Sequence, residues 1–148
     1  KFLDKIDLTK KSNTNKLLVY VQYANIYKNM DDAKQAYICY NNATVEMQNN
    51  SNNTNKNILE KLYCELLLKD NKPDKALVSL ETLLTESKNT NDIILTLSLE
   101  ESLGFCYKQL NNNAMAKKYF VEVITKLEVF NDKDNRINKL KDEIKSFN

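Results

Sequence analysis

Apolar and small residues recur along this chain at spacings of three and four, which is the period of an amphipathic helix. The pattern predicts three consecutive pairs of helices, near 15–29 and 32–48, near 57–70 and 73–87, and near 92–110 and 113–130. The turns within the pairs are short and polar. Pro73 suits the first turn of its helix, and the expected caps of the equivalent helices are Asp31 or Asp32 and Asn111 or Asn112.

The same pattern repeats every 40 residues, as the alanines at positions 36, 76 and 116 show. At fixed offsets from these alanines, the three repeats carry residues of similar size, and each such set of equivalent positions is called a column. The columns are Tyr23, Tyr63 and Leu103; Ala24, Cys64 and Gly104; Tyr27, Leu67 and Tyr107; Tyr40, Leu80 and Phe120; Ala43, Leu83 and Val123. Small residues allow paired helices to cross closely, and larger ones fill the surrounding space. These columns therefore predict the packing positions of three stacked helix pairs.

A further amphipathic helix is expected in residues 132–147, where Ile137, Leu140, Ile144 and Phe147 share one face. We expect it to cover the apolar end of the last pair, as a terminal helix of a repeat array must. A partner-binding or membrane-surface helix is the alternative. At the other end, Leu3 lies 40 residues before Ala43, beside Phe2 and Ile6, and the chain starts at Lys1. We therefore expect a fragment of a longer protein.

The third unit, with Leu103, Gly104, Tyr107, Ala116 and Phe120 at the family's spacings, resembles the tetratricopeptide repeat family. The period of 40 departs from the family's usual 34, so that the helices or the links between them must be longer. The resemblance implies an all-α fold, a right-handed superhelix in a single domain over 1–148. Its repeats would cover about 17–56, 57–96 and 97–130, with the capping helix at about 132–147.

In this family, the first helices of the pairs line a concave surface that binds protein or peptide partners. Carried over by register, the residues on that surface are Asn25, Lys28, Lys61, Glu65, Lys69, Glu101, Phe105 and Lys108. They predict a mixed-charge groove, although a solvated helical face explains any single one equally well. Phe105 is the residue that would be costly to leave in water.

The chaperone-binding members of the family hold a terminal carboxylate with a clamp of Lys, Asn and Arg side chains. Asn25 fits one position of that clamp, but Val21, Leu62, Ser98 and Ser102 stand where its other members belong. The resemblance therefore disfavours a co-chaperone role through such a clamp.

The residue composition excludes most kinds of catalytic site. The chain has no histidine, so Cys-His and Ser-His pairs and mixed zinc sites are excluded. The adjacent Glu100 and Glu101 point apart on a helix, and no glycine-rich phosphate loop exists. Three widely spaced cysteines among apolar neighbours favour buried, reduced thiols in an intracellular, cytoplasmic setting. We expect no enzyme activity, no cofactor and no metal.

The partners of this chain are expected to be proteins or peptides. A net charge of +2 is too small to predict a nucleic-acid partner, and no apolar stretch is long enough for membrane insertion. The sequence favours a scaffold or adaptor module that binds a segment or helix of a partner within a larger assembly. The alternative is a peptide-sensing regulatory domain of a larger regulator. The sequence leaves the oligomeric state open.

Overall fold

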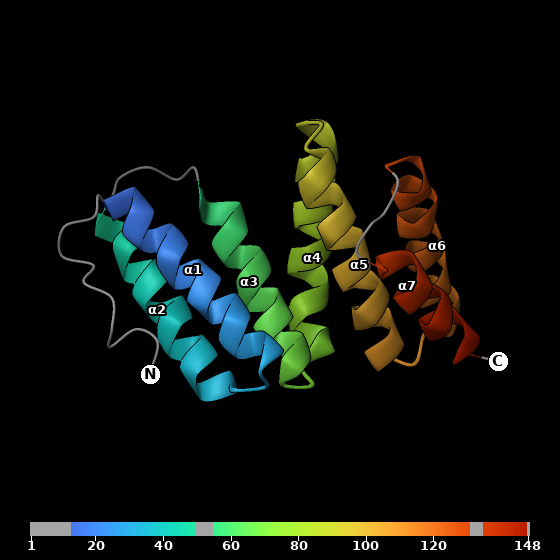
Figure 1. Cartoon of the computed structure of the whole chain (residues 1–148), viewed down its shortest axis with the longest axis horizontal. Helices are drawn as coiled ribbons and strands as arrows, with labels where there is room; N and C mark the ends of the chain where they lie inside the picture. The colour runs from blue at the N-terminus through green and yellow to red at the C-terminus, as the bar shows by residue number, and fades with distance from the viewer. Residues whose placement is uncertain (1–12, 50–54, 131–134, 148) are drawn as a thin grey trace. The chain divides into compact units, whose positions relative to one another are not determined.

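The computed structural model describes residues 13–49, 55–130 and 135–147, and within these ranges it has seven α-helices and no strand. The helices are α1 (Asn13–Asn29), α2 (Ala33–Asn49), α3 (Lys56–Lys69), α4 (Pro73–Asn89), α5 (Ile93–Gln109), α6 (Asn113–Val129) and α7 (Arg136–Lys145) (Figure 1). The all-α prediction and the predicted helices are confirmed. The residues from which an earlier repeat was expected, Phe2, Leu3 and Ile6, lie outside the described residues.

The 40-residue period comes from long helices, because the links within the repeats stay short. Five of the helices have 17 residues: α1, α2, α4, α5 and α6. Three residues separate α1 from α2, α3 from α4, α4 from α5, and α5 from α6. A 17-residue helix with a three-residue link occupies 20 positions, so that two of each span one period.

Each three-residue link turns on one residue with a positive φ angle. These residues are Asp31, Asn71, Asn91 and Asn111, with φ between 55° and 59°. Asp and Asn tolerate this left-handed conformation best after glycine, which explains how a chain with a single glycine makes these turns. In the links that contain Asp31, Asn91 and Asn111, the amide that follows the left-handed residue bonds back to a carbonyl five residues earlier, as in Asp32 N to Tyr27 O at 2.9 Å.

The starts of the helices agree with the caps expected from the sequence. Asp32 Oδ1 accepts from the Gln35 amide at 3.1 Å, and Asn112 Oδ1 accepts from the Met115 amide at 3.2 Å. Asp92 caps α5 in the same way, through the Leu95 amide at 3.0 Å. Pro73 is the first residue of α4, where its missing N–H leaves no helical bond unmade.

The chain divides into two compact units, residues 1–70 and 71–148. The described helices of the first unit are α1, α2 and α3, and those of the second are α4 to α7. The boundary falls between α3 and α4, the two helices that were expected to form the second repeat. The single domain over 1–148 and the right-handed superhelix stay predictions.

In the first unit, α1 and α2 form an antiparallel pair and α3 packs against both (Figure 1). Its core contains a cluster of buried residues: Leu17, Val21, Ala24, Tyr27, Ala36, Cys39, Ala43, Leu59, Leu62 and Leu66. The small-residue columns are fully buried where α1 meets α2, as predicted. In the column of larger residues with Tyr23 and Leu103, Tyr63 of α3 is 41% exposed and stacks on Tyr40 with ring centroids 5.4 Å apart.

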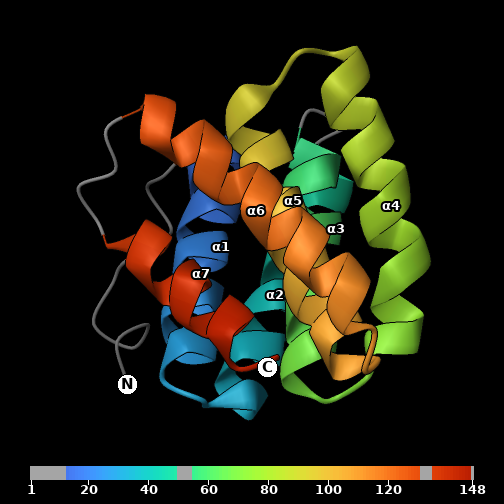
Figure 2. The same cartoon turned by 90° about the vertical axis from the view of Figure 1, so that its right-hand side faces the viewer.

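In the second unit, α5 pairs with α6, while α4 packs against α5 and α7 against α6 (Figure 2). The ring of Phe120 is fully buried and packs against Gly104. A Cβ atom built on Gly104 would come within 3.0 Å of three atoms of this ring. The glycine is therefore required by close packing. The apolar face predicted for the last helix packs into the apolar cluster of the second unit, with Leu140 buried and the Phe147 ring stacked on Phe120 at a centroid distance of 6.3 Å. The buried residues of this apolar cluster are Leu97, Ala116, Phe120, Val123, Ile124, Leu127 and Leu140.

No helix in the described part of the chain is long and apolar enough to cross a membrane.

Candidate functional site

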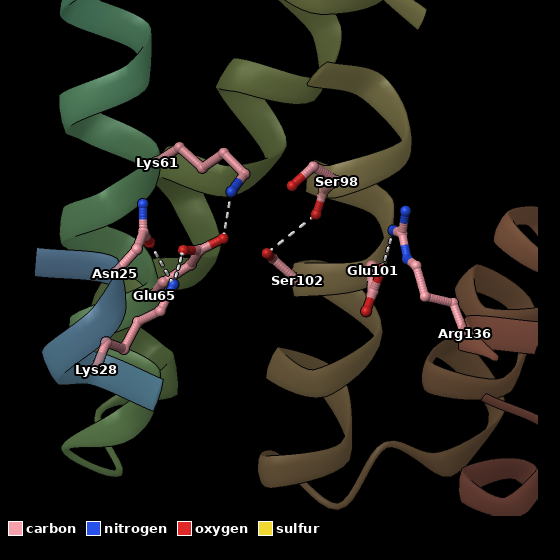
Figure 3. Close-up of polar contacts among 8 residues, drawn as sticks. All are labelled: Asn25, Lys28, Lys61, Glu65, Ser98, Glu101, Ser102 and Arg136. Carbon is pink, nitrogen blue, oxygen red and sulfur yellow. Dashed lines mark hydrogen bonds and ion pairs between the residues drawn. The ribbon is translucent and has the colours of Figure 1, made fainter. Parts of the chain in front are cut away.

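Four of the residues predicted to line a binding surface form one polar cluster in the first unit. Lys28 of α1 and Lys61 of α3 both donate to the Glu65 carboxylate, one to each oxygen (Figure 3). Lys28 Nζ also donates to Asn25 Oδ1 at 2.9 Å. The sequence placed these side chains on one surface by register, and the structure brings them into contact across α1 and α3.

The Glu65 carboxylate lies mostly out of solvent, with a side chain that is 16% exposed. Burial by itself raises the pKa of this carboxyl, but the positive charges and hydrogen bonds of Lys61 and Lys28 outweigh it, so that the pKa of Glu65 is lowered. The ionised carboxylate thus ties α3 to α1. Because two lysines share one carboxylate, the cluster keeps one positive charge.

The lowered pKa of Glu65 predicts an acid-sensitive contribution to stability. A carboxyl whose pKa is lower folded than unfolded stabilises the fold above its unfolded pKa of about 4.3, and this stabilisation disappears as the pH falls through the folded pKa. We expect Glu65→Gln to lose stability at pH 7 but little at strongly acidic pH. Urea unfolding of both proteins between pH 7 and pH 3 measures this. A stability difference that stays constant over the range would contradict it.

Lys69, the fifth predicted residue of this unit, lies apart from the cluster at the end of α3. Its Nζ donates to Asp31 Oδ1 at 2.8 Å, and both side chains are largely exposed. An exposed pair of this kind adds little to stability. Lys69 is therefore available to a partner at a small cost.

In the second unit, the three predicted residues face the last helix. Glu101 of α5 pairs with Arg136 of α7 (Figure 3). Lys108 pairs with Glu143 of α7. Phe105 is half-buried, and its ring meets Phe120 edge to face with centroids 5.0 Å apart. The cost of exposing Phe105 is thus avoided, since the ring packs into the apolar cluster that α7 completes.

The structure also places the positions that correspond to the carboxylate clamp. Val21 and Leu62 are buried in the core of the first unit. In the second unit, the Ser102 hydroxyl donates to the Ser98 backbone carbonyl at 3.1 Å, on its own helix (Figure 3).

A buried carboxylate in the second unit was missed by the sequence reasoning. Glu100 is fully buried, and Lys126 Nζ of α6 donates to its two oxygens at 2.6 and 2.5 Å. Lys88 Nζ of α4 lies 3.5 Å from Glu100 Oε1. The apolar neighbours Leu97, Leu99 and Leu103 were the available signal, because they occupy several faces of α5 and leave little of it for solvent.

The candidate metal ligands and nucleophiles of the described residues are carboxylates and cysteines. Within the ranges that the structure describes, no group of three or more Cys, Asp or Glu side chains is placed to hold a metal ion. The three cysteines are buried thiols that form no disulfide with one another. Burial, followed by the carboxylates of Asp74 and Glu81, raises the pKa of the Cys106 thiol to about 11, which disfavours the nucleophilic thiolate.

Comparison with known families finds a match to the tetratricopeptide repeat at residues 17–44 and 101–125. The first segment covers most of α1 and the larger part of α2, and the second covers parts of α5 and α6. A search of curated proteins and a search of solved structures each gave no match.

Proposed function

Because this chain belongs to the tetratricopeptide repeat family, whose repeats generally mediate protein–protein interactions, we propose that it is a scaffold or adaptor module that binds a protein segment along its first helices. Members of the family are typically not catalytic. The proposed binding surface in the first unit is formed by Asn25, Lys28, Lys61, Glu65 and Lys69. We leave Phe105 out of the surface because its ring is packed against Phe120.

The observation that supports this proposal most directly is the Lys28–Glu65–Lys61 cluster. It lies across two first helices, α1 and α3, so that a bound segment would contact both at once. Two lysines around one carboxylate leave a positive charge at a partly buried place, where charged groups interact more strongly than in open water. The surface would therefore favour a segment with an acidic side chain.

In the second unit, Glu101 and Lys108 are held by Arg136 and Glu143 of α7. A segment that bound there would have to replace these ion pairs or accept hydrogen bonds from their outer edges. In the first unit two lysines share one carboxylate, whereas Glu101 and Lys108 of the second unit each have a partner of their own. The excess positive charge makes the first unit the stronger candidate, and a test should begin with it.

The test begins with the immobilised full chain, which captures partners that are then identified by cross-linking and mass spectrometry. The affinity of an identified partner is measured for the wild type, for Lys61→Glu and for the control Lys34→Glu. Lys34 is an exposed lysine of α2, so the control makes the same charge change elsewhere in the first unit.

We expect Lys61→Glu to weaken partner binding at least tenfold and Lys34→Glu to leave it within twofold. Equal binding by all three proteins would reject this surface as the contact. Capture of a short free peptide instead of a protein would favour the peptide-sensing alternative.

A further inference from the structure

We propose that the outward face of α1 docks an amphipathic α-helix of a partner protein. This face consists of Val19, Gln22 and Ile26 of α1 and of Met30, the residue that follows its end, at spacings of three and four. Ile26 is 42% exposed and Met30 is 61% exposed. The proposal does not depend on the binding surface described above, which uses Asn25 and Lys28 on another side of the helix.

The same positions are covered in the other first helices. Forty and eighty residues further along, the first three positions of the face correspond to Leu59, Leu62 and Leu66 in α3 and to Leu99, Ser102 and Cys106 in α5. All six of these residues are buried. In the first unit, the three leucines of α3 share a cluster with Ala36, Cys39 and Ala43 of α2. α2 is the second helix of the preceding pair and comes directly before α3 in the chain. What covers this face is therefore a helix.

Contacts between α4 and α5 indicate how such a helix lies. Cys106 Sγ donates to the Pro73 carbonyl at 3.4 Å near the start of α4, and Ser87 Oγ lies 2.9 Å from Thr96 Oγ1 near its end. The covering helix thus runs antiparallel to the first helix and spans nearly its whole length. The exposed apolar surface of Ile26 and Met30 is where such a helix would bury its own apolar side chains.

Charge indicates what the docked helix carries at its polar edge. The segment Asn13–Asn29 contains Lys16 and Lys28 and no acidic residue. Lys28 is paired with Glu65, whereas Lys16 stands at the position of Thr96, the residue that meets Ser87 of α4. A carboxylate at the position of Ser87 would therefore face Lys16. The partner is a helix with an apolar stripe and an acidic residue in its last turns.

A synthetic probe can be built from α4 itself. The peptide has the sequence of residues 73–89 with Ser87→Glu, and a cross-link between positions 78 and 82 keeps it helical, since both positions are exposed in the chain. Fluorescence anisotropy follows its binding to the full chain. We expect saturable binding that Ile26→Glu with Met30→Glu weakens at least tenfold. The control Val45→Glu, at a residue of α2 that is 52% exposed, should leave it unchanged.

A peptide with Ser87→Lys should bind several-fold more weakly than the glutamate peptide. Circular dichroism checks that the double variant stays folded; should it unfold, Gln22→Arg takes its place in the comparison. Binding that is absent, or that is equal in the wild type and the variant, overturns the proposal. So does a tenfold gain in affinity on deletion of residues 1–12, or a self-association in ultracentrifugation that the variant abolishes, because the occupant is then this chain's own segment or a second copy.

Discussion

Replacing Lys126 with methionine is expected to lower the free energy of unfolding by about 3 kcal/mol or more. Lys126 donates two hydrogen bonds to Glu100, whose side chain is fully buried between helices of the second unit. Methionine keeps much of the length of the lysine side chain but removes its charge. The buried carboxylate then loses its main partner, and the folded state carries the cost of an uncompensated charge.

Two further variants test whether the loss of stability comes from the Glu100–Lys126 pair. Lys88→Met removes the more distant and more exposed lysine, 3.5 Å from Glu100, and should cost less than about 1 kcal/mol. Replacing both Glu100 and Lys126 with leucine removes the charges together, and should restore most of the lost stability. Urea unfolding followed by circular dichroism gives each value. If Lys126→Met and Lys88→Met were equally stable, the buried pair would not have the role assigned to it.

Phe120→Ala is expected to destabilise the second unit by about 3–5 kcal/mol. The ring is fully buried, and it contacts Phe105 edge to face and Phe147 by stacking. Truncation leaves a cavity that α5, α6 and α7 cannot all close, since each is held by its own neighbours. Thermal or urea unfolding measures the loss. A cost below about 1 kcal/mol would show that the site collapses around the smaller side chain.

The same ring explains why position 104 is glycine, and a double-mutant cycle tests this. In the natural protein, Gly104→Ala should destabilise by about 1–3 kcal/mol, because the new methyl group meets the Phe120 ring. In the Phe120→Ala background the obstacle is gone, and alanine should stabilise the helix by up to about 1 kcal/mol relative to glycine. The effect of one substitution is thus expected to change sign. An equal cost in both backgrounds would contradict the packing explanation.

The helices themselves could be predicted closely, because the signals that place them are local. Pro73, Asp32 and Asn112 mark helix starts by chemistry that acts within one turn, and the structure shows each of them in that role. The columns of small residues were also predicted, since a repeated chain places equivalent residues in equivalent contacts. Tyr63 departs from its column because Tyr40 offers its ring a stacking partner near the surface.

The polar contacts could be predicted only in part. Register placed Lys28 and Glu65 on one surface, but not in one ion pair, because their distance depends on how α3 packs against α1. Phe105 was expected on the binding surface, and the sequence did not predict that its half-buried ring packs on Phe120 beside α7. Glu100 was considered only as the neighbour of Glu101, although it is the buried carboxylate of the second unit.

By itself, the sequence determined the period of 40, the positions of the helices and the columns on which they pack. It could do so because helix formation and capping depend on residues a few positions apart, and repetition makes the pattern visible three times. The tertiary structure decided which charges meet and which are buried. Lys28 and Glu65 are 37 residues apart and Glu100 and Lys126 are 26 apart, so that only the packing of separate helices brings their side chains together and removes them from water.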